Sequence, residues 1–74
     1  MNDKHIEYAI NAIQSFLAAR PDSADTIEGI HNWWIDWGEL PESIAITEQA
    51  LQQLKEHGLM RSVVIGNREI WRHI

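Results

Sequence analysis

The sequence predicts an α+β domain with three helices and a C-terminal two-stranded β-hairpin. Two segments, about 4–19 and 42–57, carry apolar residues at helical spacings of three and four. Gly58 follows the second segment and supplies the left-handed residue that commonly ends a helix. Beyond it, two short stretches, about 59–65 and 68–73, flank a Gly-Asn pair that suits a two-residue hairpin turn.

The first helix is expected from about Lys4 to Ala19. Pro21 ends it, because a proline disfavours helical geometry in the residue before it. We expect Pro21 to Ala24 to form a turn. The inward stripe of this helix consists of Ile6, Ala9, Ile10, Ile13, Phe16 and Leu17.

The second helix is expected over about residues 26–35. Asp25 is the predicted cap, with Glu28 three residues later completing an acidic capping box. Gly29 within the helix costs about 1 kcal/mol relative to alanine, and a close backbone approach to the first helix could offset this cost. The inward residues are Ile27, Ile30 and Trp34.

The third helix is expected to end at His57, and Pro41 suits a first helical position. Its start is open between Glu42 and Glu48, since Thr47 is itself an acceptable cap. The inward residues are Ile46, Ala50, Leu51 and Leu54.

The hairpin turn at Gly66-Asn67 fixes the predicted pairing of the two strands. It pairs Ile65 with Arg68, Val63 with Ile70 and Arg61 with Arg72. These six residues share one face, and a slip of one residue would reverse every assignment. The other face carries Met60, Ser62, Val64, Glu69, Trp71 and His73.

Length and composition describe one small domain spanning 1–74. The chain has 74 residues, no cysteine and a formal charge of −5. No apolar run approaches the roughly 20 residues that cross a bilayer, and the N-terminus lacks a secretion-signal profile. We therefore expect a soluble cytoplasmic protein with no membrane partner.

The charge is unevenly distributed along the chain. Residues 1–40 carry a net −5 and residues 41–58 a net −2, whereas residues 59–74 carry a net +2. Because phosphate contacts dominate nucleic-acid affinity, the total charge argues against unaided nucleic-acid binding. The hairpin is the only basic part.

The residues from the third helix onward resemble small bacterial winged helix-turn-helix domains over about 42–74. The resemblance implies that the third helix is a recognition helix and the hairpin a wing. DNA-binding members present basic and amide side chains from that helix. In this chain the outward positions include two acids and one base, which departs from that pattern; they are Glu48, Gln49, Gln52, Gln53, Lys55 and Glu56. The residues that carry the resemblance are Ile46, Ala50, Leu51, Leu54, Gly58, Leu59, Met60, Gly66, Asn67 and Trp71.

Trp33, Trp34 and Trp37 form the densest aromatic segment. Helical neighbours point about 100° apart, so Trp34 is expected inward and Trp33 at the edge of the apolar stripe. Trp37 is expected just past the helix end. Two interpretations remain open: all three fill a small core, or Trp33 and Trp37 contact a partner, as tryptophan often does in interaction hot spots.

Arg61, Arg68 and Arg72 are the second candidate set. Arg61 and Arg72 would face each other across the hairpin, and like charges opposed in this way are unfavourable. An anion or a partner carboxylate could relieve the repulsion. Relief by the domain's own acids is the interpretation that we favour, since residues 1–40 carry seven.

The chain shows no sign of catalysis or of a cofactor. Its four histidines lack ligand spacing and are expected to be solvated or capping, and no nucleophile motif or glycine-rich phosphate loop is present. We predict no catalytic residue, no metal site and no cofactor. The histidines are His5, His31, His57 and His73.

The hypothesis is therefore a non-catalytic, regulatory binding module. It would act by protein–protein contact or homodimerisation, with Trp33 and Trp37 in the interface. The alternative is a DNA-binding transcriptional regulator that uses the helix at 42–57 and the basic wing. Its contact residues would be Gln49, Gln52, Gln53, Lys55, Arg61, Arg68 and Arg72.

Overall fold

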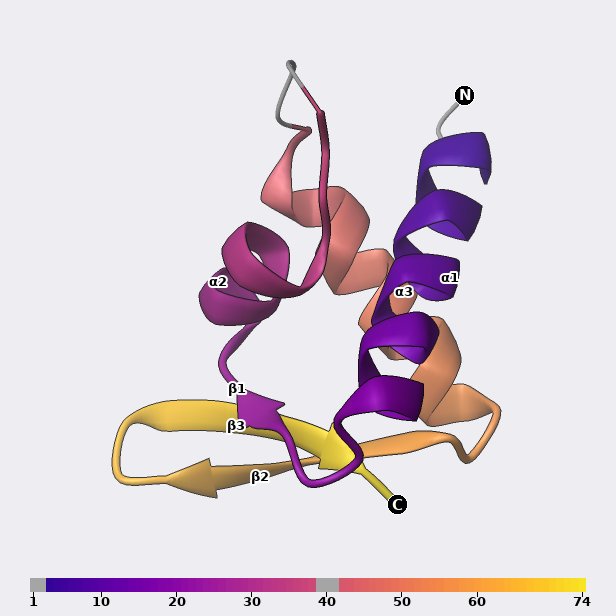
Figure 1. Ribbon diagram of the computed structural model, residues 1–74. Coiled ribbons are helices and arrows are strands. Elements are labelled where there is room, and N and C mark those ends of the chain that lie inside the picture. Colours follow the sequence, from indigo (N-terminus) through magenta and orange to yellow (C-terminus); the bar gives the residue numbers. More distant parts are fainter. Residues whose placement is uncertain (1–2, 39–41) are drawn as a thin grey trace.

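The computed structural model describes residues 3–38 and 42–74, and it confirms the α+β class (Figure 1). Three helical segments stand on one face of a three-stranded antiparallel sheet with the strand order β1-β3-β2. The C-terminal hairpin supplies two of these strands. None of the helices in the described residues has the combination of length and hydrophobicity that spanning a bilayer requires.

Helix α1, Asp3–Ala19, forms where the apolar stripe predicts it. Four of its predicted inward residues, Ile6, Ala9, Ile13 and Leu17, are buried, and the other two, Ile10 and Phe16, are partly buried. The helix ends with a hydrogen bond of 2.8 Å from the Arg20 amide to the Phe16 carbonyl, just before Pro21. The prediction of 4–19 is therefore confirmed.

Strand β1, Ala24–Asp25, was not predicted from the sequence, which assigns Ala24 to a turn. It pairs Ala24 with Arg72 and Asp25 with Trp71. Two residues are too few to show the alternation by which a strand is recognised. It lies between the first two helices in the chain, and it pairs with the C-terminal part of the last strand, β3.

The second helical segment consists of α2, Ile27–Gly29, and a π-helical turn η1, Ile30–Trp34. Thr26 caps it, since its hydroxyl accepts a hydrogen bond of 3.2 Å from the Gly29 amide. The prediction of an Asp25 cap is wrong by one residue. Because Asp25 belongs to β1, its carboxylate instead accepts from the Thr26 amide at 2.8 Å.

Gly29 was expected to allow a close approach to the first helix, but the structure shows a different neighbour. A Cβ at this position would lie 2.1 Å from the Asp25 Oδ1 atom. The close neighbour is therefore the β1 carboxylate and not the backbone of α1. A side chain at this position would have to displace the Asp25 carboxylate, which occupies the space beside the glycine.

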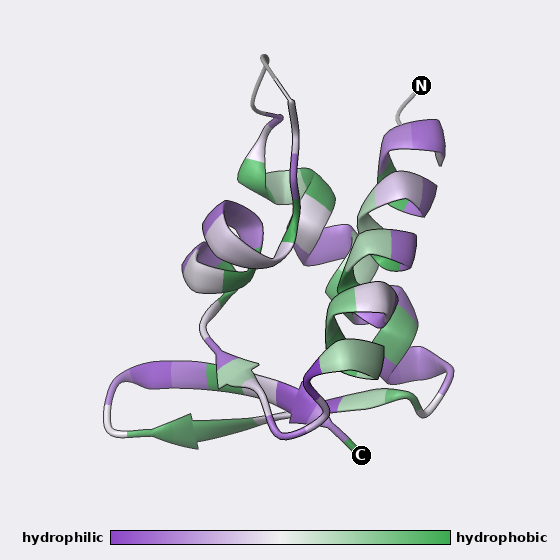
Figure 2. Ribbon diagram, in the orientation of Figure 1, coloured by the Kyte–Doolittle hydropathy of each residue, from purple (hydrophilic) through white to green (hydrophobic). Residues whose placement is uncertain are grey.

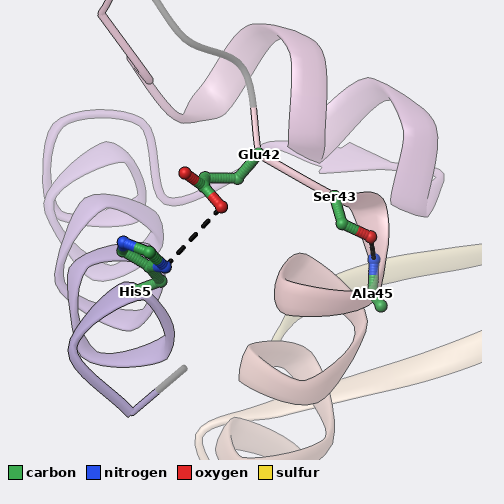
Figure 3. Close-up of polar contacts among 4 residues, drawn as sticks. All are labelled: His5, Glu42, Ser43 and Ala45. Atoms are coloured by element: carbon green, nitrogen blue, oxygen red, sulfur yellow. Dashed lines mark hydrogen bonds and ion pairs between the residues drawn. The ribbon is translucent and has the colours of Figure 1, made fainter. Parts of the chain in front are cut away.

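Helix α3, Ile44–Glu56, begins within the range from Glu42 to Glu48 that the sequence leaves open. Ser43 caps it by accepting a hydrogen bond of 3.2 Å from the Ala45 amide (Figure 3). Next to the cap, Glu42 lies 3.6 Å from the His5 imidazole of α1. The proposed role of Pro41 lies outside the described residues.

Helix α3 ends at Glu56, one residue before the predicted end at His57, which is its C-cap. Gly58 has a φ of 75°, the left-handed geometry that suits glycine. Thr47, the alternative cap, is instead fully buried within the helix.

Strands β2, Met60–Ile65, and β3, Arg68–His73, form the C-terminal hairpin in the predicted register. Met60 and Trp71 lie on the face that packs against the helices, and both are buried. The tip extends past the helices, where the apolar end of β2 lies beside the polar start of β3 (Figures 1 and 2). The hydrophobic core consists of Ile6, Ala9, Ile13, Leu17, Ile30, Trp34, Ile35, Ile46, Ala50, Leu51, Leu54, Met60 and Trp71.

Candidate functional site

The turn η1 directs two adjacent tryptophans to opposite environments. Trp34 is buried and stacks on Phe16, with ring centroids 4.5 Å apart and planes 11° apart. Trp33 is 79% exposed. The prediction that Trp34 points inward is confirmed, whereas Trp33, which was expected at the edge of the stripe, lies outside it. Single π-helical turns occur frequently at functional sites, which makes this segment a candidate site.

Trp37 lies beyond the end of η1 and is half-buried. Its indole Nε1 donates a hydrogen bond of 2.9 Å to the His31 carbonyl. Its ring centroid lies 5.7 Å from that of Tyr8 and 5.2 Å from that of His31. Trp37 is thus held in a fixed orientation, with part of its ring in contact with solvent.

Tyr8 completes this arrangement from α1. Its side chain is 48% exposed, and its hydroxyl donates a hydrogen bond to the Asp36 carbonyl. Tyr8 was not identified from the sequence, because it lies off the apolar stripe of the helix. We call Tyr8, Trp33 and Trp37 the aromatic surface. Trp33 and Trp37 both line a shallow depression. Its lining consists of Asn32, Trp33, Trp34, Ile35, Asp36, Trp37 and Gly38.

His31 supports the aromatic surface from within. It is buried, and its Nδ1 lies 2.6 Å from the hydroxyl oxygen of Thr47, which is fully buried on α3. The expectation of a solvated or capping histidine is wrong here. The missed signal is spacing, since His31 follows Ile27 by four positions on the inward side of the helix.

The outer face of α3 places Gln49, Gln52 and Gln53 side by side with two acids. A shallow depression on this face is lined by Glu48, Gln49, Gln52, Gln53 and Glu56. Lys55 is not part of it, because its ammonium lies 5.8 Å from the ring centroid of Trp71. The helix thus exposes amides and carboxylates on this face, while its one cation is directed toward the sheet.

The outer face of the sheet carries the three arginines with three apolar residues. Arg61 pairs with Arg72 as expected, and Arg68 pairs with Ile65 beside the turn. All three arginines are exposed. Within residues 3–38 and 42–74, none of them forms an ion pair with a carboxylate. The expected relief of the repulsion between Arg61 and Arg72 by the domain's own acids is therefore not found among these residues. We call this the basic sheet face; it consists of Arg61, Val63, Ile65, Arg68, Ile70 and Arg72.

The predicted site residues therefore lie in separate places. Trp33 and Trp37 share the aromatic surface, the three glutamines share the outer face of α3, and the arginines share the sheet. In the described part of the chain, no group of three or more histidine, aspartate or glutamate side chains is arranged to hold a metal ion.

The fold and these surfaces define the class of molecule: a small α+β domain with exposed aromatic and basic surfaces. No protein-family model matches the chain, and neither a curated protein nor a solved structure matches it.

Proposed function

We propose that this protein is a non-catalytic, regulatory binding module of winged-helix type. It acts in the cytoplasm by contact with a protein partner or with a second copy of itself. The aromatic surface, with Trp33 and Trp37, is the interface. The observation that carries the proposal is Trp33, a tryptophan that is 79% exposed in a chain that buries Trp34 and Trp71.

Exposing an indole is costly, since large apolar side chains gain about 1.5–3 kcal/mol from full burial. The energy is recovered when a partner covers the ring, and tryptophans are enriched among the residues that dominate binding energy. Trp33 therefore has the chemistry of an interface anchor.

The neighbours of Trp33 are already ordered for binding. Trp37 is held by its hydrogen bond to His31, and His31 is held by Thr47. A rigid surface loses little conformational freedom on association, which favours affinity. A partner with an apolar side chain to place beside Trp33 would find Trp37 and Tyr8 already positioned.

The alternative, a DNA-binding regulator, has one feature in its favour: the exposed arginines of the hairpin, which would grip phosphates. The outer face of α3 argues against DNA binding, since Glu48 and Glu56 flank the glutamines there. Lys55 is directed toward Trp71, away from the depression. A recognition helix with this surface would bring carboxylates toward phosphates, at an electrostatic cost.

The test is an NMR titration of isotope-labelled protein, first against its own concentration and then against mixed-sequence duplex DNA at low salt. We expect concentration-dependent shifts at Trp33 and Trp37 if the partner is a second copy. The Trp33→Ala variant should abolish them, whereas Ile74→Ala, which removes another exposed apolar side chain, should not.

If the natural partner is a different protein, affinity capture with the wild-type domain and with Trp33→Ala will separate specific from non-specific partners. A specific partner is lost with Trp33→Ala and retained with Ile74→Ala. Shifts confined to residues 47–57 and 61–72 on addition of DNA would replace this proposal with the DNA-binding alternative.

A further inference from the structure

Strand β2 has an open edge. In the order β1-β3-β2 it pairs only with β3, along its whole length from Met60 to Ile65. Proteins commonly protect such edges with proline, bulges or several charges. This strand has no proline, its register with β3 is continuous, and it carries one charge, at Arg61. The edge is therefore free to accept another strand.

The backbone groups available at this edge follow from the turn. A two-residue loop makes Ile65 and Arg68 a hydrogen-bonded pair. Hydrogen-bonded and non-hydrogen-bonded pairs alternate along an antiparallel ladder, so Val63 and Arg61 also direct their backbone groups toward β3. The amide and carbonyl groups of Ser62 and Val64 then point away from β3, toward the open edge. These are the groups that an added strand would bind.

The side chains beside this edge have a definite chemistry. On the basic sheet face, β2 presents Arg61, Val63 and Ile65 in that order, and the last two are 37% and 63% exposed. Arg72 lies directly across from Arg61. Like charges opposed in this way are unfavourable, and no carboxylate among the described residues pairs with either of them.

We propose that the edge of β2 binds an extended acidic peptide segment of a partner protein, which adds to the sheet as a fourth strand. A carboxylate of the peptide lies next to Arg61 and relieves its repulsion with Arg72. Two apolar side chains, at alternate positions after it, cover Val63 and Ile65. Strand addition uses backbone hydrogen bonds for affinity and alternate side chains for selectivity.

Charge complementarity selects this occupant over the alternatives. Residues 59–74 carry a net +2 in a chain with a formal charge of −5, so the favourable field is confined to the hairpin. A short acidic segment reaches that field without approaching the acidic remainder of the domain. Duplex DNA is larger and would meet the net repulsion, and a second β2 would bring another Arg61 instead of a carboxylate.

The probe is a fluorescent ten-residue peptide in which glutamate and two valines occupy alternate positions and threonine fills the rest. Its matched control has lysine in place of glutamate. Fluorescence anisotropy gives the dissociation constant, and NMR of the labelled protein gives the location. We expect the strongest amide shifts at Ser62 and Val64 and at least tenfold weaker binding of the lysine peptide.

Two variants test the two parts of the interaction. Val64→Pro removes an edge amide that β3 does not use, and edge strands tolerate proline at such positions; we expect at least tenfold loss of affinity. Arg61→Glu should reverse the preference, so that the lysine peptide binds better. Lys4→Ala, which removes a positive charge from exposed Lys4 on α1, should leave affinity unchanged.

Several results would overturn the inference. Absence of binding at millimolar peptide, shifts centred on Trp33, or equal affinity for the two peptides would each do so. Concentration-dependent shifts at Ser62 and Val64 without peptide would assign the edge to a second copy, and preferential binding of duplex DNA would assign it to nucleic acid. If Val64→Pro does not fold, Arg61→Glu still decides the outcome. The proposal for the aromatic surface is separate, since Trp33→Ala should leave peptide binding intact.

Discussion

The contact between His31 and Thr47 offers the sharpest test of how the aromatic surface is held. Thr47 has no exposed surface and His31 is 7% exposed, so neither group can exchange its partner for bulk water. Thr47→Val keeps the shape of the side chain and removes the hydroxyl. The imidazole Nδ1, now 2.6 Å from that hydroxyl oxygen, would then lack its partner.

The magnitude follows from the burial of both groups. Leaving a buried polar group unsatisfied costs about 1–3 kcal/mol. A domain of this size is stable by roughly 4–11 kcal/mol, and each kcal/mol moves its Tm by about 4–8 °C. We therefore expect Thr47→Val to be about 2 kcal/mol less stable, with a Tm lower by roughly 10 °C.

The assay is thermal and urea unfolding followed by circular dichroism. Thr47→Ser keeps a hydroxyl and loses a methyl group, so it should retain the His31 contact and serves as the matched control. NMR should also show a shift of the Trp37 indole proton in Thr47→Val, because the His31 imidazole that contacts Thr47 lies 5.2 Å from the Trp37 ring, centroid to centroid. A valine variant as stable as the wild type, with an unmoved Trp37 signal, would refute the proposed role of the hydroxyl.

Three further predictions concern other parts of the chain. Gly29→Ala should not gain the usual helix stabilisation of about 1 kcal/mol, because its Cβ would lie 2.1 Å from the Asp25 Oδ1 atom. In an Asp25→Ala background the same change should stabilise the domain, and urea unfolding of the wild type, the two single variants and the double variant measures the difference. Trp33→Phe should shift the fluorescence emission maximum to the blue without changing the Tm, since it removes the most exposed indole; an unchanged maximum would contradict the exposure of Trp33. Ser43→Ala should cost about 1 kcal/mol by removing the cap of α3, whereas Ser15→Ala, at an exposed position within α1, should change the unfolding free energy little; equal effects would argue against the cap.

Much of the fold could be predicted because its signals are local. The apolar stripe and Pro21 bound α1, and Gly58 ends α3. The two-residue turn at Gly66-Asn67 fixes every pair of the hairpin, since turn length determines register. These features depend on residues close together in the sequence.

The features that were missed depend on residues far apart. Strand β1 exists only because β3 returns to pair with it, and this pairing displaces Asp25 from the cap position to Thr26. The contact between His31 and Thr47 joins separate helices. A π-helical turn has the same apolar spacing as an α-helix over so few residues, so η1 could not be distinguished from the sequence.

The candidate site was predicted in part. Helical geometry predicts Trp34 inside, which the structure confirms, and Trp33 at the edge of the apolar stripe, whereas Trp33 is more exposed than that. The pairing of Arg61 with Arg72 also follows from the turn. Tyr8 was missed because its role depends on the carbonyl of Asp36, which α1 meets only in the folded chain.

The pairing of β1 with β3 has a kinetic consequence. Residues 24–25 pair with residues 71–72, so this pairing closes a far longer loop than the hairpin of β2 and β3 does. Closing a long loop is entropically unfavourable until other contacts are in place. The helices and hairpin can therefore assemble first, with β1 joining late. On a ribosome β1 would have to wait for residues 71–72 to emerge.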